Sequence, residues 1–140
     1  MADESDATDG APAASLPFDG PVLLIASAKA SVPPDRLPVL LRRAQTHLRD
    51  GRDRYERRFE RVVSTRDRAV FLVPADHWSA VGDRLGFDRR ETDAVRRTHE
   101  EQLHRLGSDL GRSEEFEAAL DIRQAVVIGL PAAEPAEEQS

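Results

Sequence analysis

Apolar residues recur at intervals of three and four over residues 37–59, and this spacing predicts a long amphipathic helix. Pro38 is compatible with this helix because it falls in the first turn. Gly51 lies within the apolar stripe, and because the apolar phase continues beyond it, we expect close packing against this glycine rather than a break. The stripe consists of Leu37, Leu41, Ala44, Leu48, Gly51, Tyr55 and Phe59.

An earlier helix is predicted to begin at Asp19-Gly20-Pro21, which combines a capping side chain with a proline suited to a helix start. The alanine-rich sequence up to Ala30 favours continuing it. A buried strand over residues 22–26 is the alternative.

Two short apolar, β-branched runs, Arg61–Val63 and Ala69–Val73, are separated by the polar connection Ser64–Asp67. A connection of this length between two such runs predicts a hairpin of antiparallel strands. The segment Gln124–Leu130 predicts a third strand that joins the hairpin.

Three helices are expected between the hairpin and this last strand. The first is predicted to be capped by Asp76 and to end at Gly86. The second begins with a capping box formed by Asp88 and Glu91 and extends to Gly107. The third covers residues 113–120. The element order is therefore ααββαααβ, an α+β fold that is mostly helical with a small antiparallel sheet.

Charge divides the 140 residues into a folded segment and two ends. Residues 1–20 contain five acids and no base, and residues 131–140 contain three acids and no base. We therefore expect disordered acidic tails at 1–17 and 131–140, and a single domain at 18–130.

The basic residues are unusual because Lys29 is the only lysine among 20 of them. An arginine-rich chain with a net charge of −6 suits a protein that stays soluble in concentrated salt, although a GC-rich genome also favours arginine. No apolar run approaches the roughly 20 residues of a membrane span, and the acidic N-terminus differs from a secretory signal. A cytoplasmic location is expected.

Four segments resemble small uncharacterised proteins from halophilic archaea. They are Ala28-Lys29-Ala30-Ser31-Val32-Pro33, Val73-Pro74-Ala75-Asp76-His77-Trp78, Ala94-Val95-Arg96-Arg97-Thr98-His99-Glu100-Glu101-Gln102 and Val126-Val127-Ile128-Gly129. The resemblance covers residues 18–130. It supports the saline habitat and implies no particular activity.

Histidines are the main candidates for a metal-binding or catalytic role, because the chain has no cysteine. His99 and His104 are five residues apart, which separates them by roughly 140° around a helix, so we expect no zinc ion bound between them. His99 falls on the apolar side, as a core or boundary histidine with one hydrogen-bond partner, and we expect His104 to face solvent. We expect no metal, no cofactor and no catalytic site, since no known catalytic motif occurs.

His77 and Trp78 follow Asp76 at a predicted helix start, and with His99 they are candidates for a small-ligand pocket. The structural interpretation is simpler. In it Asp76 caps the helix, Trp78 anchors it in the core, and His77 is exposed.

Nucleic-acid binding is suggested by two segments. Residues 42–68 contain ten arginines, from which Arg54, Arg57, Arg58 and Arg61 are candidates for phosphate contacts, although Tyr55 and Phe59 are in phase with the core. Residues 76–106 are similar to a helix-turn-helix in which Arg89 and Arg90 begin the second helix. Thr92 departs from that pattern, because an aliphatic residue is usual there.

These observations favour a non-catalytic protein-interaction or regulatory module, with a protein partner or self-association through the 37–59 helix. Nucleic-acid binding is the alternative function, and an enzymatic or ligand-binding pocket is the third.

Overall fold

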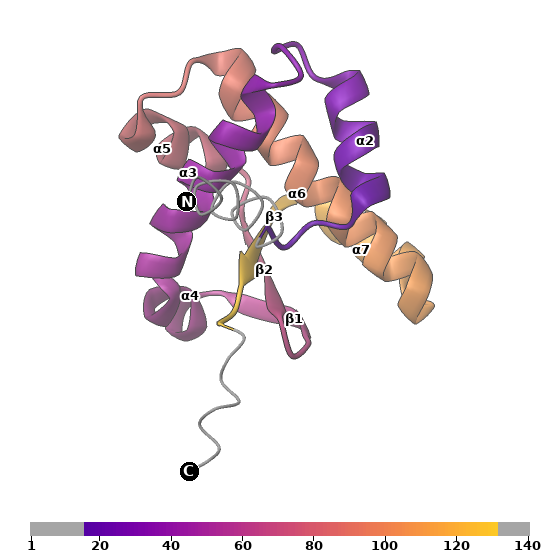
Figure 1. The fold of residues 1–140 in the computed structure, drawn as a ribbon. Helices are drawn as coiled ribbons and strands as arrows, with labels where there is room; N and C mark the ends of the chain where they lie inside the picture. Colours follow the sequence, from indigo (N-terminus) through magenta and orange to yellow (C-terminus); the bar gives the residue numbers. More distant parts are fainter. Residues whose placement is uncertain (1–15, 132–140) are drawn as a thin grey trace, which may run out of the picture.

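The computed structural model describes residues 16–131, which form six helices and three strands (Figure 1). The predicted tails fall outside this range, apart from Leu16, Pro17 and Pro131. The α+β class and the antiparallel sheet are confirmed. The elements are α2 (Gly20–Lys29), α3 (Arg36–Asp50), α4 (Arg52–Arg58), β1 (Glu60–Ser64), β2 (Arg68–Pro74), α5 (His77–Leu85), α6 (Arg89–Leu110), α7 (Ser113–Leu120) and β3 (Arg123–Gly129).

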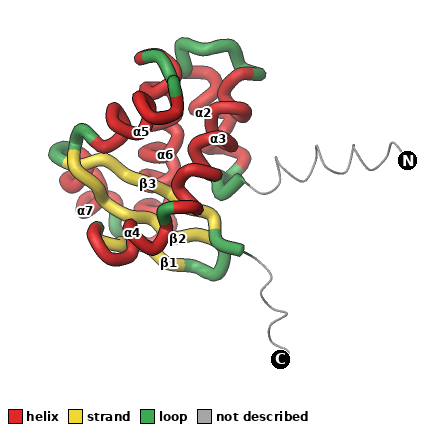
Figure 2. Tube along the Cα trace, turned by 90° about the vertical axis from the view of Figure 1, so that its left-hand side faces the viewer, coloured by secondary structure: helices red, strands yellow, loops and turns green. Residues whose placement is uncertain are grey.

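The three strands form one sheet in the order β1-β2-β3. β1 and β2 are the predicted hairpin, with a shift of register at Val62, and β3 pairs antiparallel along the whole of β2. Five consecutive residues of β2 are buried, as are the last five of β3, so both faces of these strands are covered. Figure 2 shows α3, α5 and α6 on the β3 side of the sheet, away from β1.

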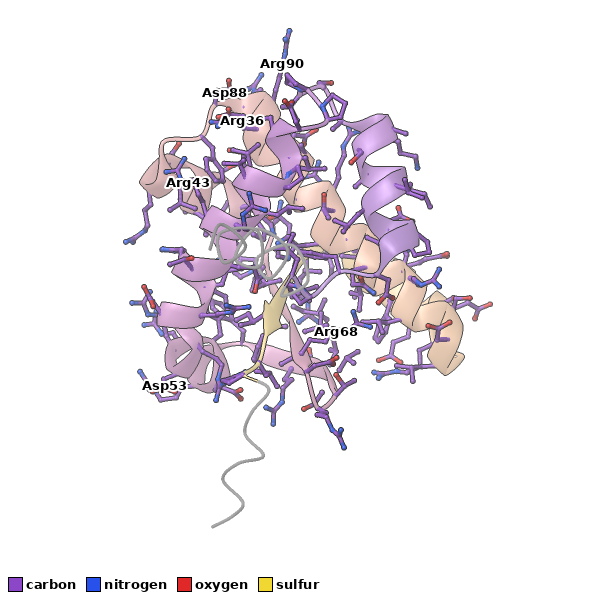
Figure 3. All side chains as sticks on the ribbon, viewed as in Figure 1. Arg36, Arg43, Asp53, Arg68, Asp88 and Arg90 are labelled. Atoms are coloured by element: carbon purple, nitrogen blue, oxygen red, sulfur yellow. The ribbon has the colours of Figure 1, made fainter. Side chains whose placement is uncertain are left out.

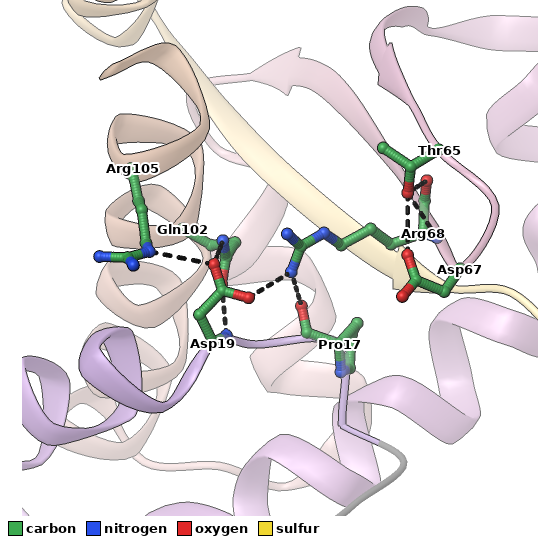
Figure 4. A network of polar contacts seen from close by, with 7 residues as sticks. All are labelled: Pro17, Asp19, Thr65, Asp67, Arg68, Gln102 and Arg105. Carbon is green, nitrogen blue, oxygen red and sulfur yellow. Dashed lines mark hydrogen bonds and ion pairs between the residues drawn. The ribbon is translucent and has the colours of Figure 1, made fainter. Parts of the chain in front are cut away.

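α2 is a helix, as predicted, but Asp19 does not cap it with its side chain. Pro21 lacks the N–H that such a cap commonly binds, and the Asp19 carboxylate instead accepts hydrogen bonds from Arg68, Gln102 and Arg105 at 3.0–3.1 Å (Figure 4). Burial alone would raise the pKa of this carboxyl group, but these partners hold it below its usual value. Asp19 thereby joins the start of α2 to α6 and β2.

The predicted helix over 37–59 is divided at Gly51 into α3 and α4, so the expectation of one continuous helix is wrong. A Cβ added at Gly51 would have its nearest neighbours at 3.8 Å, which shows that close packing does not require this glycine. The break follows from the low helix propensity of Asp50 and Gly51. The apolar pattern continues across this break: Leu48 and Tyr55 are buried and Phe59 is half-buried.

α6 begins with the predicted capping box, in which Asp88 and Glu91 each bind the other's backbone N–H. It ends at Gly111, whose φ of 70° favours glycine, and the predicted end at Gly107 is wrong. Gly107 lies inside the helix, where a Cβ would stand 3.0 Å from the Phe116 ring. This glycine therefore serves the close approach of α7 to α6.

Candidate functional site

The outer edge of β3, on the side away from β2, is bonded by helix side chains instead of by a fourth strand. Trp78 of α5 donates its Nε1–H to the Ala125 carbonyl at 2.9 Å. His99 of α6 accepts the Val127 N–H at its Nδ1 atom, also at 2.9 Å. Backbone groups that would otherwise be buried without partners are satisfied in this way.

Gln45 of α3 completes this arrangement, and we call Gln45, Trp78 and His99 the edge clamp. The Gln45 amide donates to the Val127 carbonyl at 2.7 Å and accepts the Gly129 N–H at 3.0 Å. All three side chains are at most 2% exposed. Since an unpaired strand edge invites pairing with another chain, the edge clamp both joins three helices to the sheet and protects β3.

The role of His99 as an acceptor fixes its protonation. Because Nδ1 accepts a hydrogen bond, the neutral ring carries its proton on Nε2. Within residues 16–131 that Nε2 atom has no hydrogen-bond partner, and the ring packs against Phe18 and Trp78 at centroid distances of 4.9 and 4.5 Å. Complete burial lowers the pKa of His99 to about 3. The ring is therefore neutral across the physiological pH range.

His77 is half-buried, so the expectation that it is exposed is wrong. Its Nε2 atom lies 2.5 Å from the Tyr55 hydroxyl, and the Phe59 ring meets it edge-on at 5.4 Å. Burial lowers the pKa of His77 and raises the pKa of Tyr55 to about 12, so both groups are neutral at pH 7. This pair ties the start of α5 to α4.

The start of α5 is capped from a distant strand. Asp76 stands at the N-cap position but makes no side-chain cap, because its backbone (φ −104°, ψ 9°) departs from the extended conformation of capping residues. The Trp78 N–H donates instead to Gln124 Oε1 of β3 at 2.9 Å. The prediction that Asp76 caps this helix is wrong.

The three candidate ligand-binding residues do come together, as a row of rings. His77 and Trp78 are 6.5 Å apart between ring centroids, and Trp78 and His99 are 4.5 Å apart. Trp78 is 1% exposed and His99 is completely buried, and each of the three side chains already has an internal hydrogen bond. The contacts describe a structural cluster, and a ligand role for these residues stays a prediction.

His104 lies exposed on α6, apart from the buried His99. In the part of the chain that the structure describes, no three His, Asp or Glu side chains are grouped closely enough to hold a metal ion. Among residues 16–131, no helix combines the length and the apolar character needed to cross a membrane.

The candidate arginines lie in two separate regions. Arg54, Arg57 and Arg58 are exposed on α4, and the adjacent Arg61 pairs with Glu56 at 2.9 and 3.1 Å. Arg89 and Arg90 occupy the first turn of α6, from which Arg90 extends outward (Figure 3). Tyr55 and Phe59 pack inward, away from any base that the α4 arginines would approach.

Arg89 and Arg90 border a cleft of about 530 Å³ between α2, α5 and α6, which we call the basic cleft. Its charged lining residues are Lys29, Asp83, Arg89, Arg90, Asp93, Arg96 and Arg97. The sequence did not reveal this site, because Lys29 is brought to Arg89 only by the packing of α2 against α6. Trp78 also borders the basic cleft, whereas His77 and His99 do not.

The comparison with protein families matches residues 16–130 to a domain of unknown function, DUF8048. The chain belongs to the DUF8048 family. No curated protein and no solved structure matches it.

In the DUF8048 domain, the helix pair that is similar to a helix-turn-helix is held by a close contact between α5 and α6. A Cβ added to the buried Gly82 would overlap Thr92 Oγ1 and stand 3.0 Å from Thr92 Cγ2. The polar Thr92, which departs from the usual motif, thus packs against a glycine that leaves room for it. Gly86, with φ 76°, forms the left-handed turn between the helices.

The outer face of α2 is a second feature that the sequence did not reveal. Val22 and Ala26 are buried, but the opposite face is also apolar, with Leu24 74% and Ile25 40% exposed. Pro21 and Ala28 extend this face along the helix. We call Pro21, Leu24, Ile25 and Ala28 the α2 stripe.

Proposed function

We propose that the DUF8048 domain is a non-catalytic protein-interaction module of a salt-adapted cytoplasm, and that its partner docks on the α2 stripe. The observation that carries this proposal is a helix that is apolar on both its buried and its exposed face. Helices with apolar residues all round are normally covered on every side. Apolar burial does not depend on charge attraction and therefore persists in concentrated salt, where charges at the edge of a contact contribute chiefly to the choice of partner.

The length of the α2 stripe indicates what kind of partner covers it. From Pro21 to Ala28 the stripe spans about 10 Å of helix, at 1.5 Å per residue. A second copy that contacts only these four side chains would bury far less than the roughly 800 Å² per partner of a standard stable interface. A contact of this size suits a short amphipathic segment of a partner rather than an extended interface.

The charges around the α2 stripe give the partner's chemistry. α2 contains no acidic residue, and Lys29 stands at its C-terminal end. At its N-terminal end lies Arg105, whose side chain is 44% exposed while it pairs with Asp19. The complementary partner is an amphipathic helix with an apolar face and acidic flanks.

Two synthetic amphipathic peptides test this proposal, one with leucines flanked by glutamates and one with the same leucines flanked by lysines. We expect the glutamate peptide to shift amide NMR signals of Leu24, Ile25 and Ala28, and the double variant Leu24→Ser/Ile25→Ser to weaken its binding at least tenfold, because two apolar anchors are lost. Ile122→Ser is the matched control, since Ile122 is 71% exposed outside the stripe.

Equal binding of the lysine peptide, or an equal loss in Ile122→Ser, would contradict the proposed surface. A dimer seen by sedimentation equilibrium that dissociates in the double variant would replace the acidic partner with a second copy.

Nucleic-acid binding is the second candidate function, favoured by the exposed arginines of α4. No carboxylate among residues 16–131 forms an ion pair with Arg54, Arg57 or Arg58. If these residues bind phosphates, filters will retain single-stranded RNA at about 50 mM salt, retention will fall steeply as salt rises, and Arg54→Gln/Arg57→Gln/Arg58→Gln will abolish it. Absence of retention at about 50 mM salt would exclude this function.

A further inference from the structure

The basic cleft gathers cationic side chains from two elements that are distant in the sequence. Lys29, the last residue of α2, and Arg89 and Arg90, the first residues of α6, all line it. Lys29 is the only lysine of the chain. The packing of α2 against α6 therefore concentrates positive charge around one hollow.

Ion pairing leaves this charge partly uncompensated. Arg96 and Arg97, also in the lining, both pair with Asp93, and Arg96 pairs with Glu100 as well. No acid among the described residues pairs with Lys29, Arg89 or Arg90. Asp83 is the remaining carboxylate of the lining. The lining of the cleft therefore includes three cations without an ion pair and one such carboxylate.

The remaining lining of the cleft is part polar and part apolar, from Ser31, Ser79, Thr92 and Gln124 and from Ala30, Trp78, Phe87 and Ala94. A volume of about 530 Å³ falls within the range of small-molecule sites. A duplex fits this site poorly, because a recognition helix must protrude into a groove, whereas α6 begins here beside the end of α2. The shape favours a small ligand.

We propose that the basic cleft binds a small polyanion through phosphate or carboxylate groups held by Lys29, Arg89 and Arg90. Arginine donates paired hydrogen bonds to either group, and lysine supplies a compact charge. This inference shares Lys29 with the proposed partner surface on α2, whereas Arg89 and Arg90 line the cleft alone, so the Arg89→Gln/Arg90→Gln variant tests the cleft separately.

The test is isothermal titration of the full chain at about 50 mM salt with two probes, inorganic pyrophosphate and citrate. We expect saturable binding of at least one probe with one-to-one stoichiometry. Arg89→Gln/Arg90→Gln and Lys29→Gln should each weaken it at least tenfold, because charged hydrogen bonds are lost. Binding of pyrophosphate alone identifies a phosphate ligand, and binding of citrate alone identifies a carboxylate ligand.

Arg66→Gln is the matched control, because Arg66 is an exposed arginine in the hairpin turn, outside the cleft. Its affinity should equal that of the parent. Circular dichroism confirms that each variant is folded before titration. No saturable binding of either probe, or the same loss in Arg66→Gln as in the cleft variants, would overturn the proposal.

Discussion

Replacing His99 by leucine is expected to lower the free energy of unfolding at pH 7 by about 2 to 3 kcal/mol. Leucine is apolar and of similar size, but it offers no acceptor to the Val127 N–H, which would be left buried and unpaired. Chemical denaturation followed by fluorescence of Trp78, the chain's only tryptophan, measures the change. His104→Leu, an exposed position on the same helix, is the control and should change stability by less than about 0.5 kcal/mol.

The loss in His99→Leu is expected to depend on pH. In the parent, the pKa of His99 is about 3 when folded, against 6.5 for an ordinary histidine. Between these values the unfolded chain binds one more proton, so His99 makes the folded state less stable by about 1.4 kcal/mol for each pH unit lowered. Above pH 6.5 this effect vanishes, because the ring is neutral in both states.

His99→Leu removes this pH dependence but leaves the smaller contributions of His47 and His77, whose pKa values are also lowered by burial. The difference in stability between parent and variant should therefore narrow as the pH falls and approach zero near pH 5. A difference that stays constant from pH 7 to pH 5 would show that His99 takes up its proton in the folded protein at the same pH as in the unfolded chain.

Replacing Gly82 by alanine is expected to destabilise the domain by about 2 kcal/mol, although alanine favours a helix by about 1 kcal/mol. The new Cβ would overlap Thr92 Oγ1, and neither helix can move without disturbing the buried contacts of α5 and α6. Thermal or chemical unfolding measures the loss. Gly20→Ala, with nothing within 4 Å of the added Cβ, is the control and should be nearly neutral.

A double-mutant cycle isolates the Gly82–Thr92 contact. Thr92→Ala removes Oγ1 and Cγ2, after which the nearest Thr92 atom to the added Cβ is its own Cβ at 3.1 Å. Gly82→Ala should then cost at least 1 kcal/mol less than it does in the parent. Additive effects of the two substitutions would contradict the packing between α5 and α6.

The sequence predicted those elements that depend on interactions between residues close together in the chain. Asp88 and Glu91 lie three residues apart and bind each other's backbone, so the start of α6 was readable from the sequence. The hairpin of β1 and β2 follows from two β-branched runs with a short polar connection. The burial of His99 was likewise evident from its position on the apolar side of a helix.

Long-range contacts account for what the sequence did not reveal. Asp76 and Asp19 have the residue type of a cap, but Gln124 of β3 caps α5 and Pro21 leaves Asp19 to bind other side chains. Periodicity alone gave no sign of the break at Gly51, since the apolar phase continues across it. The α2 stripe was not evident because an apolar sequence alone does not show which face of a helix its neighbours leave uncovered.

The candidate site likewise combines features that the sequence predicted with features that only the fold revealed. His77, Trp78 and His99 lie in one row, but their hydrogen-bond partners, Tyr55 and two backbone groups of β3, became evident only in the fold. The basic cleft could not be predicted from the sequence, because it forms only where α2 packs against α6. Surface chemistry in this chain thus depends on contacts between elements far apart in the sequence.

The edge clamp is tested most directly by two-bond ¹H–¹⁵N NMR correlations of the histidine rings, recorded from pH 8 to pH 5. We expect the His99 signals to show a proton on Nε2, an unprotonated Nδ1 and no titration over this range. A His99 ring protonated on Nδ1, or one that titrates near pH 6.5, would show that Val127 does not donate to it and that the outer edge of β3 is not closed in this way.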